Sequence, residues 1–479
     1  MSIKIIESYK KLSVQVKATV WFTSCSMLQK GISFITIPVF TRLLTPEQYG
    51  MYSLYLSWLQ ILSIVTSLYL YYGVFNNAMI KYENKRDEYI SSMQGLTTVV
   101  TSFFLITVFL FPDFWTDLIG LSPFIIVLMF VEMYVTPSFQ FWTGKKRFEY
   151  KYKKMVVVSL SLSFLNPVLG LLLVFSFKEK GTARILSAML TDIIICGILY
   201  LLQLIKGKKL YVKEYWTYAL KMAVPLLPHY LSGMILNQGD RVMIDRMIGK
   251  SEVAYYSIAY SIGMLVQIVT TAVLNSLTPW MYQNIKEKKN NEIKGTINSV
   301  LLIVAFAIVM LVMFSPEMMS LFGSKEYASA VYVIPPVVAS AFFIFLYNLL
   351  AIPQFYYEKT EFLMISSIIA ALANIGLNFI FISRYGYYAA GYTTLVCYML
   401  YCIGHYSVSN NILKEIDDKQ ALFDLRYIVL LSLLLIFICL GTNYLFDYFI
   451  VRVLIILLSC FLCVIKRNYI VEIIKDVRK

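Results

Sequence analysis

Polar or small residues recur at helical spacing within four stretches that are otherwise apolar. They are Thr23, Ser26, Lys30 and Ser33; Ser53, Ser57, Gln60, Ser63 and Ser67; His229, Gly233, Asn237 and Asp240; and Tyr260, Gln267, Thr271, Asn275 and Thr278. Steps of three, four or seven residues place each set on one face of a helix. In lipid, such a face turns toward a cavity or another helix. The stripes therefore predict a shared aqueous cavity or, as is simpler for any single Ser or Thr, close helix packing.

Lys30 is the most costly of these residues. A lysine near the middle of a membrane costs about 2.5–3.5 kcal/mol on insertion scales, so it requires a partner or a use. One interpretation is a buried ion pair with Glu132 or Asp192, the other charges embedded in apolar segments, and another is a cationic contact for an anionic substrate. A proton or sodium relay would also use such a carboxylate. The sequence leaves ion pairing and ion coupling both open.

Further charged or titratable residues flank the stripes. His229 is able to titrate near neutral pH, or to serve only as a hydrogen-bonding group. Three arginines near the outer ends of the predicted helices either steer a phosphate or pair with Asp240 and Asp245; they are Arg42, Arg241 and Arg246.

Motifs of covalent chemistry are missing from the sequence. It contains no H-E-x-x-H, G-x-S-x-G or D-x-D, and Gly249-Lys250-Ser251 lacks the upstream glycine of a nucleotide-binding loop. The seven cysteines lie in apolar segments, and Cys460-x-x-Cys463 has no second pair of ligands for a metal. We therefore expect a protein that is not an enzyme and that holds no metal or cofactor.

Composition places these residues in a membrane protein. The chain has 479 residues, of which 59% are hydrophobic and 15% are charged, whereas soluble domains are about 45–50% apolar and about 25% charged. Spanning helices need about 20 apolar residues. We predict an all-α integral membrane protein with fourteen spans, at 18–41, 50–73, 91–112, 121–143, 155–177, 184–205, 218–240, 253–282, 297–320, 330–353, 363–383, 389–408, 427–446 and 449–465.

Lys and Arg are distributed unevenly between the predicted loops. With the N-terminus inside, 31 of the 42 lie on the cytoplasmic side, 10 lie outside and Lys30 lies within a span. By the positive-inside rule both termini are cytoplasmic. This bias also explains most of the net charge of +14, so no nucleic-acid partner is expected. Residues 1–17 read as an interfacial amphipathic segment rather than a cleaved signal.

An internal repeat organises the spans. At an offset of 204 residues, Arg42 aligns with Arg246, Tyr52-Ser53 with Tyr256-Ser257, and Ile80-Lys81 nearly with Ile285-Lys286. Six spans make one repeat, so the two halves are predicted to run in the same direction, with substrate bound between them. The predicted parts are residues 1–17, an N-lobe at 18–212, a C-lobe at 213–409, and two additional helices with a cytoplasmic tail at 410–479.

The segments after the first and seventh spans resemble a known family. Arg42-Leu-Leu-Thr-Pro-Glu-Gln-Tyr-Gly-Met-Tyr-Ser, and Gly239-Asp240-Arg241 through Gly249 followed by Val253–Tyr260, are similar to bacterial polysaccharide repeat-unit flippases of the Wzx type. These flippases, which serve O-antigen, capsule or exopolysaccharide synthesis, belong to the multidrug/oligosaccharidyl-lipid/polysaccharide exporter superfamily. The resemblance extends over the whole chain.

The resemblance implies a substrate and a location. An undecaprenyl-diphosphate-linked oligosaccharide would enter a cationic cavity from the cytoplasmic leaflet of the bacterial inner membrane and leave on the outer leaflet as two lobes rock. Membrane lipid, and a polymerase and chain-length protein of the same pathway, are the other implied partners. Lys30 takes the basic cavity role, with Arg42, Arg241 and Arg246 as further basic residues, and Gln60, Asn237, Gln267 and Asn275 would contact sugar.

Two other functions stay open. A cation-coupled drug exporter of the same superfamily would be favoured by twelve spans and an acidic cavity. A membrane polymerase or ligase would be favoured by a large external loop, which the sequence lacks.

Overall fold

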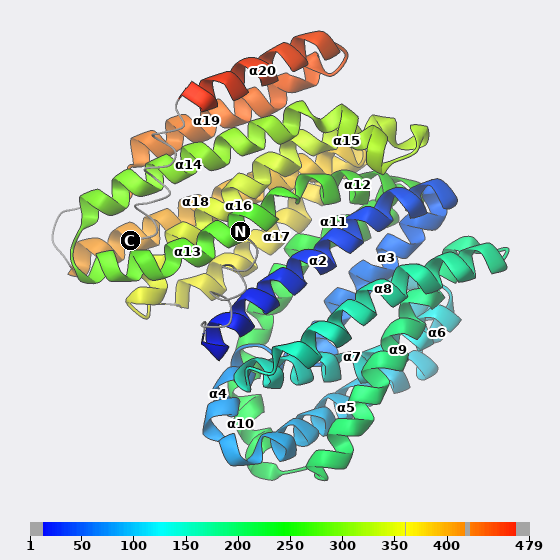
Figure 1. Ribbon diagram of the computed structural model, residues 1–479. Coiled ribbons are helices and arrows are strands. Elements are labelled where there is room, and N and C mark those ends of the chain that lie inside the picture. Colours follow the sequence, from blue (N-terminus) through cyan, green and yellow to red (C-terminus); the bar gives the residue numbers. More distant parts are fainter. Residues whose placement is uncertain (1–12, 360, 417–421, 466–479) are drawn as a thin grey trace, which may run out of the picture. The chain divides into compact units, whose positions relative to one another are not determined.

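The computed structural model describes residues 13–359, 361–416 and 422–465, and every regular element in those ranges is a helix (Figure 1). The prediction of an all-α protein is thus confirmed. The chain divides into two compact units, residues 1–234 and 235–479. The predicted interfacial segment lies mostly, and the cytoplasmic tail wholly, outside the described residues, so the side on which the termini lie stays a prediction.

The first unit is a bundle built around α9. Its helices are α2 (Val14–Leu43), α3 (Pro46–Thr66), α4 (Gly73–Lys81), α5 (Arg86–Leu110), α6 (Pro112–Ile119), α7 (Pro123–Phe148), α8 (Tyr152–Ser176), α9 (Lys180–Gly207) and α10 (Lys213–Ala223). α9 packs against α5, α7 and α8, and α8 packs against α2. In Figure 1 these helices run from blue through cyan to green.

The second unit is centred on α16. Its helices are α12 (Lys250–Gly263), α13 (Val266–Lys286), α14 (Asn290–Met313), α15 (Ser315–Phe322), α16 (Ile334–Tyr356), α17 (Glu361–Tyr385), α18 (Tyr388–Ile416), α19 (Leu425–Gly441) and α20 (Phe449–Ile465), and most of α11 (Leu227–Met247) belongs to it. α16 contacts α12, α13, α14, α18 and α19. A helix that is apolar on all sides is normally buried, and α16 is buried along most of its length.

Each of the fourteen predicted spans overlaps at least one helix. By length and hydropathy, nine helices of the described residues are able to cross a membrane, or ten if α12 and α13 form one bent span. A protein with many apolar spans is therefore confirmed, whereas the number fourteen stays a prediction. The division of 427–465 into two helices is correct, because α19 and α20 are separated by the short 3-10 helix η4 (Thr442–Leu445).

Four predicted spans are broken in the structure, including 297–320, which is interrupted at Phe314 between α14 and α15. The span expected at 50–73 ends as α3 at Thr66, because Leu68 and Tyr69 adopt the left-handed conformation with φ of 49° and 50°. The span at 218–240 is interrupted by η2 (Val224–Leu226), whose proline lacks a backbone donor. The span at 253–282 bends by 40° between α12 and α13.

Helix order and helix boundaries repeat between the units. α5 and α14 begin 204 residues apart, at Arg86 and Asn290, and a helix of 8 residues, α6 or α15, follows each of them. α2 and α11 end at Leu43 and Met247, which are also 204 residues apart. Because the sequence motifs align at the same offset, the helix boundaries support the predicted internal repeat.

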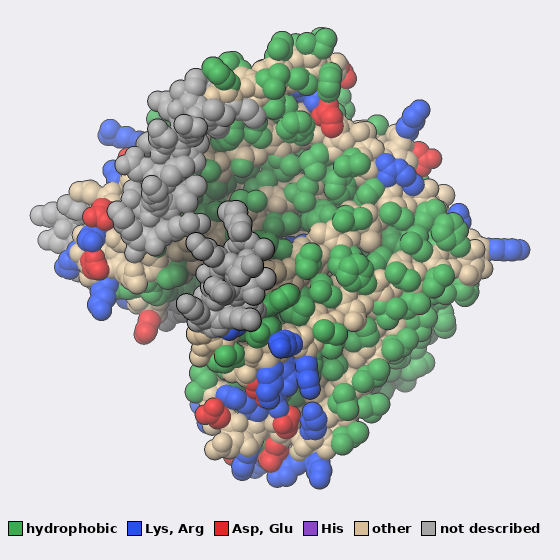
Figure 2. All heavy atoms as spheres, viewed as in Figure 1, with side chains coloured by type: hydrophobic (Ala, Val, Ile, Leu, Met, Phe, Trp, Pro, Cys, Tyr) green, Lys and Arg blue, Asp and Glu red, His purple; other side chains and the backbone are tan. Residues whose placement is uncertain are grey.

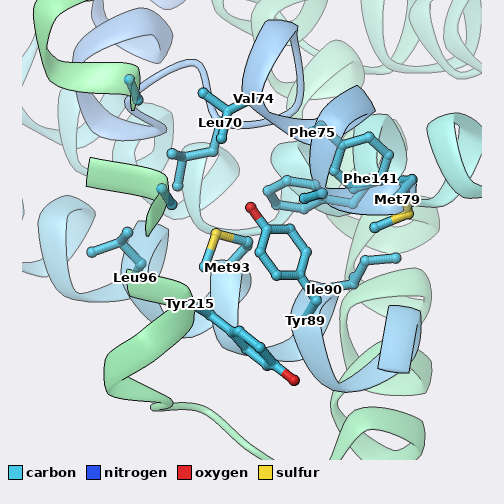
Figure 3. Packing of buried hydrophobic residues seen from close by; sticks show 13 residues of the cluster. Leu70, Val74, Phe75, Met79, Tyr89, Ile90, Met93, Leu96, Phe141 and Tyr215 are labelled. Atoms are coloured by element: carbon cyan, nitrogen blue, oxygen red, sulfur yellow. The ribbon is translucent and has the colours of Figure 1, made fainter. Parts of the chain in front are cut away.

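One apolar core joins α4, α5, α7 and α10 at an end of the first unit (Figure 3). The ring centroids of Tyr89 and Tyr215 lie 5.4 Å apart, and Phe75 packs on Phe141 at 5.5 Å. Tyr89 and Phe75 are fully buried. This core fixes the short helix α4 against the long helices that continue into the membrane.

Gly95 and Gly197 allow a matched test of this packing. A Cβ added to Gly95 on α5 would lie 2.0 Å from the carbonyl oxygen of Leu210, whereas a Cβ on Gly197 of α9 would meet nothing within 4 Å. Overpacking typically costs about 1–3 kcal/mol. We expect Gly95→Ala to lower the thermal unfolding midpoint of the purified protein and Gly197→Ala to leave it nearly unchanged. Equal midpoints for the two variants would contradict the close approach of α5 to residue 210.

Candidate functional site

A cavity of about 500 Å³ lies within the first unit. Side chains from α3, α4, α7, α9 and the first part of α11 surround it, together with the connection between α3 and α4. Its lining is rich in hydroxyl, amide and phenol groups, which are Gln60, Ser63, Thr66, Ser67, Tyr69, Tyr71, Tyr72, Asn76, Thr136, Gln140 and Thr143. Such a surface offers many hydrogen-bond donors and acceptors to a polar ligand.

One face of α7 supplies a large share of this lining. Its cavity residues are Glu132, Thr136, Gln140, Thr143 and Arg147, which follow one another at steps of four, four, three and four. This is the spacing of a single helix face. The sequence analysis recognised only Glu132, although the same periodicity signal that revealed the other stripes was present here.

The connection between α3 and α4 forms another wall. Tyr69, Tyr71 and Tyr72 line the cavity, and the rings of Tyr69 and Tyr230 are 4.7 Å apart. Non-helical backbone at membrane depth is tolerated only inside protein or beside a water-filled cavity, because lipid cannot satisfy its polar groups. The break that shortens the predicted span at 50–73 is therefore consistent with a hydrated cavity at this point.

Glu132 and Asp192 meet at the cavity from α7 and α9. Both carboxyl groups line it and they contact each other, and Tyr55 donates a hydrogen bond to Oε2 of Glu132. Glu132 is fully buried. Within the described residues no ion pair joins Lys30 to either carboxyl group, so the predicted salt bridge is not formed. Adjacent buried carboxyl groups normally hold a proton or a cation between them.

The predicted basic residues of α2 lie on its exposed surface. Lys30 and Arg42 are both exposed in the structure, and Arg42 donates a hydrogen bond of 2.7 Å to the carbonyl oxygen of Pro38. Gln60 is the predicted substrate contact that does line the cavity of the first unit. The cavity expected between the two halves stays a prediction, as do the substrate-binding roles of Lys30, Arg42 and Gln60.

The remaining predicted contacts differ in accessibility. His229, Asn237 and Gln267 are half-buried, whereas Arg246 and Asn275 are exposed. The side-chain oxygen of Asn237 accepts a hydrogen bond of 3.4 Å from Tyr260. Their substrate-binding roles stay predictions.

Arg241 is buried rather than displayed. Its guanidinium donates to Ser257 Oγ at 3.1 Å and to the carbonyl oxygen of Asn237 at 3.0 Å, and it stacks 4.5 Å from the centroid of the Tyr260 ring. Each of these contacts is internal to the second unit. In this state the guanidinium joins α11 to α12.

Asp240 lies at the centre of a fully buried polar network in the second unit. Its carboxylate accepts hydrogen bonds from Asn378 at 2.7 Å, from Thr394 at 2.8 Å and from Tyr256. Asn374 in turn donates to Thr394 at 3.3 Å. The sequence analysis missed Asn374 and Asn378, even though their spacing of four in an apolar span was a usable signal.

This network gives Asp240 a structural role that can be tested. We expect Asp240→Asn to destabilise the purified protein by about 1–3 kcal/mol, because an amide cannot accept all three hydrogen bonds. The same change at the exposed Asp117 of α6 serves as the control and should leave the unfolding midpoint unchanged. An Asp240→Asn protein with normal stability and lost transport would instead assign this residue to the substrate, as the sequence analysis expected.

Comparisons with known proteins agree with these features. The family model described as "Polysaccharide biosynthesis protein" matches residues 15–285, and the MatE model matches residues 225–380. Lsg locus putative protein 1 of Haemophilus influenzae is 23% identical over 376 residues, which cover 76% of this chain and 91% of that protein.

Solved structures of similar fold cover most of the chain. A lipid II flippase, MurJ, in an inward closed conformation has a TM-score of 0.69 at 15% identity, covering 94% of this chain and 100% of that one. An inward-facing multidrug resistance MATE family transporter of the MOP superfamily has a TM-score of 0.66 at 13% identity, covering 84% and 100%. The match over residues 15–285 confirms the resemblance seen in the sequence. The chain therefore belongs to the polysaccharide biosynthesis protein family, and its fold is similar to those of the lipid II flippase and the MATE transporter.

Proposed function

We propose that this protein translocates undecaprenyl-diphosphate-linked oligosaccharide repeat units from the cytoplasmic to the outer leaflet of the bacterial inner membrane, by alternating access. The observation that carries this proposal is the family match over residues 15–285. A polymerase and a chain-length protein of the same pathway would act on the product. The chemistry of the first unit's cavity supports the same substrate class in three ways.

The hydrogen-bonding groups of the cavity suit a sugar. Gln60, Gln140 and Asn76 offer amides, and a set of Ser and Thr hydroxyls lies beside them. A glycan presents hydroxyl groups that both donate and accept, so amides and hydroxyls are matched partners. The three cavity tyrosines add rings that pack against the apolar face of a pyranose while their hydroxyls bind its edge.

The cavity also contains a cation suited to a diphosphate. Arg147, the last member of the α7 stripe, lines it, and its guanidinium binds phosphate oxygens in a bidentate manner. Predicted topology places Arg147 on the cytoplasmic side, where the lipid-linked substrate is made. Lys30 is the further basic contact that we assign to the substrate.

The paired carboxyl groups provide a place for a coupling ion. Glu132 and Asp192 contact each other within the cavity lining, so a proton or a sodium ion held between them would be sensed by α7 and α9 together. Loss of that ion would leave two like charges in contact, which favours a different packing of these helices. In this way a proton or sodium gradient across the membrane would control the conformation of the cavity.

A cation-coupled drug exporter of the same superfamily is the alternative function. Two observations favour it: the MatE model matches residues 225–380, and the acidic pair is of the kind expected in a cavity for cationic drugs. The abundance of amide and hydroxyl groups, and the presence of Arg147, are less suited to such a ligand.

Deletion of the gene distinguishes these functions. We expect loss of the surface polysaccharide, with lipid-linked repeat units accumulating inside spheroplasts, since the substrate cannot reach the outer leaflet. Surface glycan staining and extraction of lipid-linked oligosaccharide measure both. Normal polysaccharide together with greater sensitivity to cationic dyes would transfer the assignment to the drug exporter.

Lys30 is tested by complementing the deletion strain. Lys30→Ala should reduce surface polysaccharide by about tenfold or more, because a charge-assisted hydrogen bond contributes about 1.5–3 kcal/mol. Lys178→Ala, at an exposed position of the loop before α9, is the control and should complement fully. Undiminished polysaccharide with Lys30→Ala, at equal protein levels, would remove Lys30 from the substrate site while leaving the proposed function intact.

A further inference from the structure

A second cavity of the first unit has a chemistry that the transport function does not use. It is a groove of about 530 Å³ between α7, α8 and α9. We propose that this groove binds the headgroup of an anionic membrane phospholipid, with the lipid chains lying along α8 and α9. The proposal is independent of the transported substrate, because the groove shares no residue with the cavity at Glu132 and Asp192.

The groove combines four ammonium groups with an apolar floor. Its lysines are Lys146, Lys153, Lys154 and Lys206. Val157 and Ile198, which also line it, are 65% and 55% exposed, so a large apolar surface lies next to the charges. Figure 2 shows the same pattern over the first unit, where Lys and Arg side chains gather below a broad hydrophobic surface. This arrangement matches a lipid, whose charged and apolar parts are joined.

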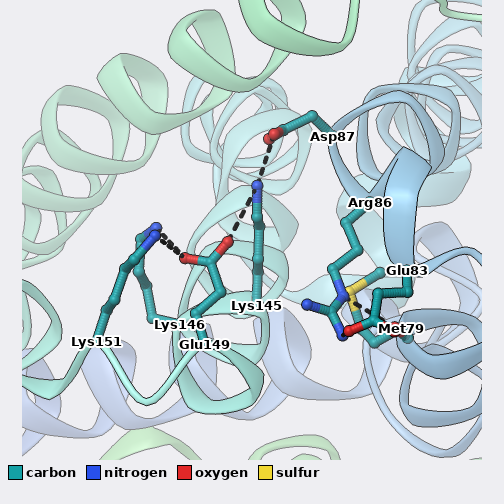
Figure 4. A network of polar contacts seen from close by, with 8 residues as sticks. All are labelled: Met79, Glu83, Arg86, Asp87, Lys145, Lys146, Glu149 and Lys151. Atoms are coloured by element: carbon teal, nitrogen blue, oxygen red, sulfur yellow. Dashed lines mark hydrogen bonds and ion pairs between the residues drawn. The ribbon is translucent and has the colours of Figure 1, made fainter.

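Glu149 neutralises one groove lysine, Lys146, and two lysines next to the groove (Figure 4). Its carboxylate contacts Lys146 at 2.9 Å, Lys151 at 3.0 Å and Lys145 at 3.4 Å, and Lys145 also contacts Asp87 at 2.7 Å. Burial opposes ionisation of Glu149, but hydrogen bonds from Lys146 and Lys151 outweigh it and lower the pKa of the carboxyl group to about 2. Glu149 is therefore fully charged at neutral pH and holds this set of lysines in place.

Three groove lysines remain without such a partner. Within the described residues, no ion pair reaches Lys153, Lys154 or Lys206, and Lys153 and Lys154 are consecutive residues near the start of α8. Like charges held together without an acid repel one another. A bound anion would reduce that repulsion.

The start of α8 strengthens the attraction for an anion. Its first turn contains no acidic residue, and no side chain caps its free N–H groups. The N-terminus of a helix carries a partial positive charge. Lysines in the first turn add to this positive potential, and a bound anion is stabilised by both. Two features thus favour a negative ligand, namely the helix terminus and the three lysines without an ion pair. Trp142, which also lines the groove, is of a type that is enriched at the membrane interface.

An anionic phospholipid fits these features better than a free phosphate. A free phosphate would satisfy the lysines but would leave Val157, Ile198 and the 46% exposed Leu202 of the groove uncovered. Basic pockets between membrane helices on the cytoplasmic side are a recurrent form of phospholipid site. The groove is accordingly assigned to a resident lipid of the surrounding leaflet.

The test compares two triple variants of the full-length protein. Lys153→Gln, Lys154→Gln and Lys206→Gln together remove the unpaired groove charges. Lys213→Gln, Lys221→Gln and Lys286→Gln remove the same charge from exposed positions outside the groove. Native mass spectrometry counts phosphatidylglycerol and phosphatidylcholine retained by each purified protein, with undecaprenyl diphosphate as competitor. Size-exclusion profiles confirm that each variant is folded.

We expect the wild-type protein and the control triple to retain phosphatidylglycerol in preference to phosphatidylcholine. The groove triple should lose that preference by about tenfold or more, since each surface lysine strengthens attraction to anionic lipid, and the corresponding Lys→Arg triple should keep it. Equal retention by the groove and control triples would overturn the proposal. It would also be overturned if undecaprenyl diphosphate, and not phosphatidylglycerol, were the lipid lost from the groove triple, because the groove would then belong to the substrate.

Discussion

The absence of water in the hydrocarbon core of the membrane is the constraint on which this structure depends. Every backbone N–H and C=O there must find a partner within the protein, so all regular elements of the described residues are helices. The same constraint explains where the helices are interrupted. The break after Thr66 lies beside the polar cavity of the first unit, where Ser67, Tyr69 and Tyr72 line a space large enough for water.

Buried polar side chains must also find partners within the protein, and the two units provide these partners in different ways. In the second unit, the carboxylate of Asp240 is surrounded by donors from α12, α17 and α18, so it joins helices without an arginine partner. In the first unit, Glu132 and Asp192 instead meet each other at the wall of the cavity. A satisfied network makes a rigid core, whereas a pair of like acids changes its preferred packing when it gains or loses an ion.

Charged side chains at the membrane surface also need partners of opposite charge. Glu149 gathers Lys145, Lys146 and Lys151 into one network. The other three groove lysines, Lys153, Lys154 and Lys206, remain available to an external anion. A leaflet rich in anionic lipid supplies that anion without any cost of bringing it from solution. The cavity at Glu132 and the groove at Lys153 thus present different surfaces to their surroundings: the first is polar and carries acids, and the second is basic with an apolar floor.

The sequence by itself determined the class of the protein, the helical segments and the family. This was possible because hydropathy and the spacing of residues along the chain are properties of the sequence alone. The predicted division of 427–465 into two helices is correct, and the motifs at Arg42 and Asp240 indicated the family that the match over residues 15–285 shows. Only the tertiary structure decided which polar residues meet. Lys30 does not pair with Glu132, Asp240 is enclosed by Asn378 and Thr394, and the stripe of α7 lines the cavity, because each depends on how helices distant in sequence rotate and pack against one another.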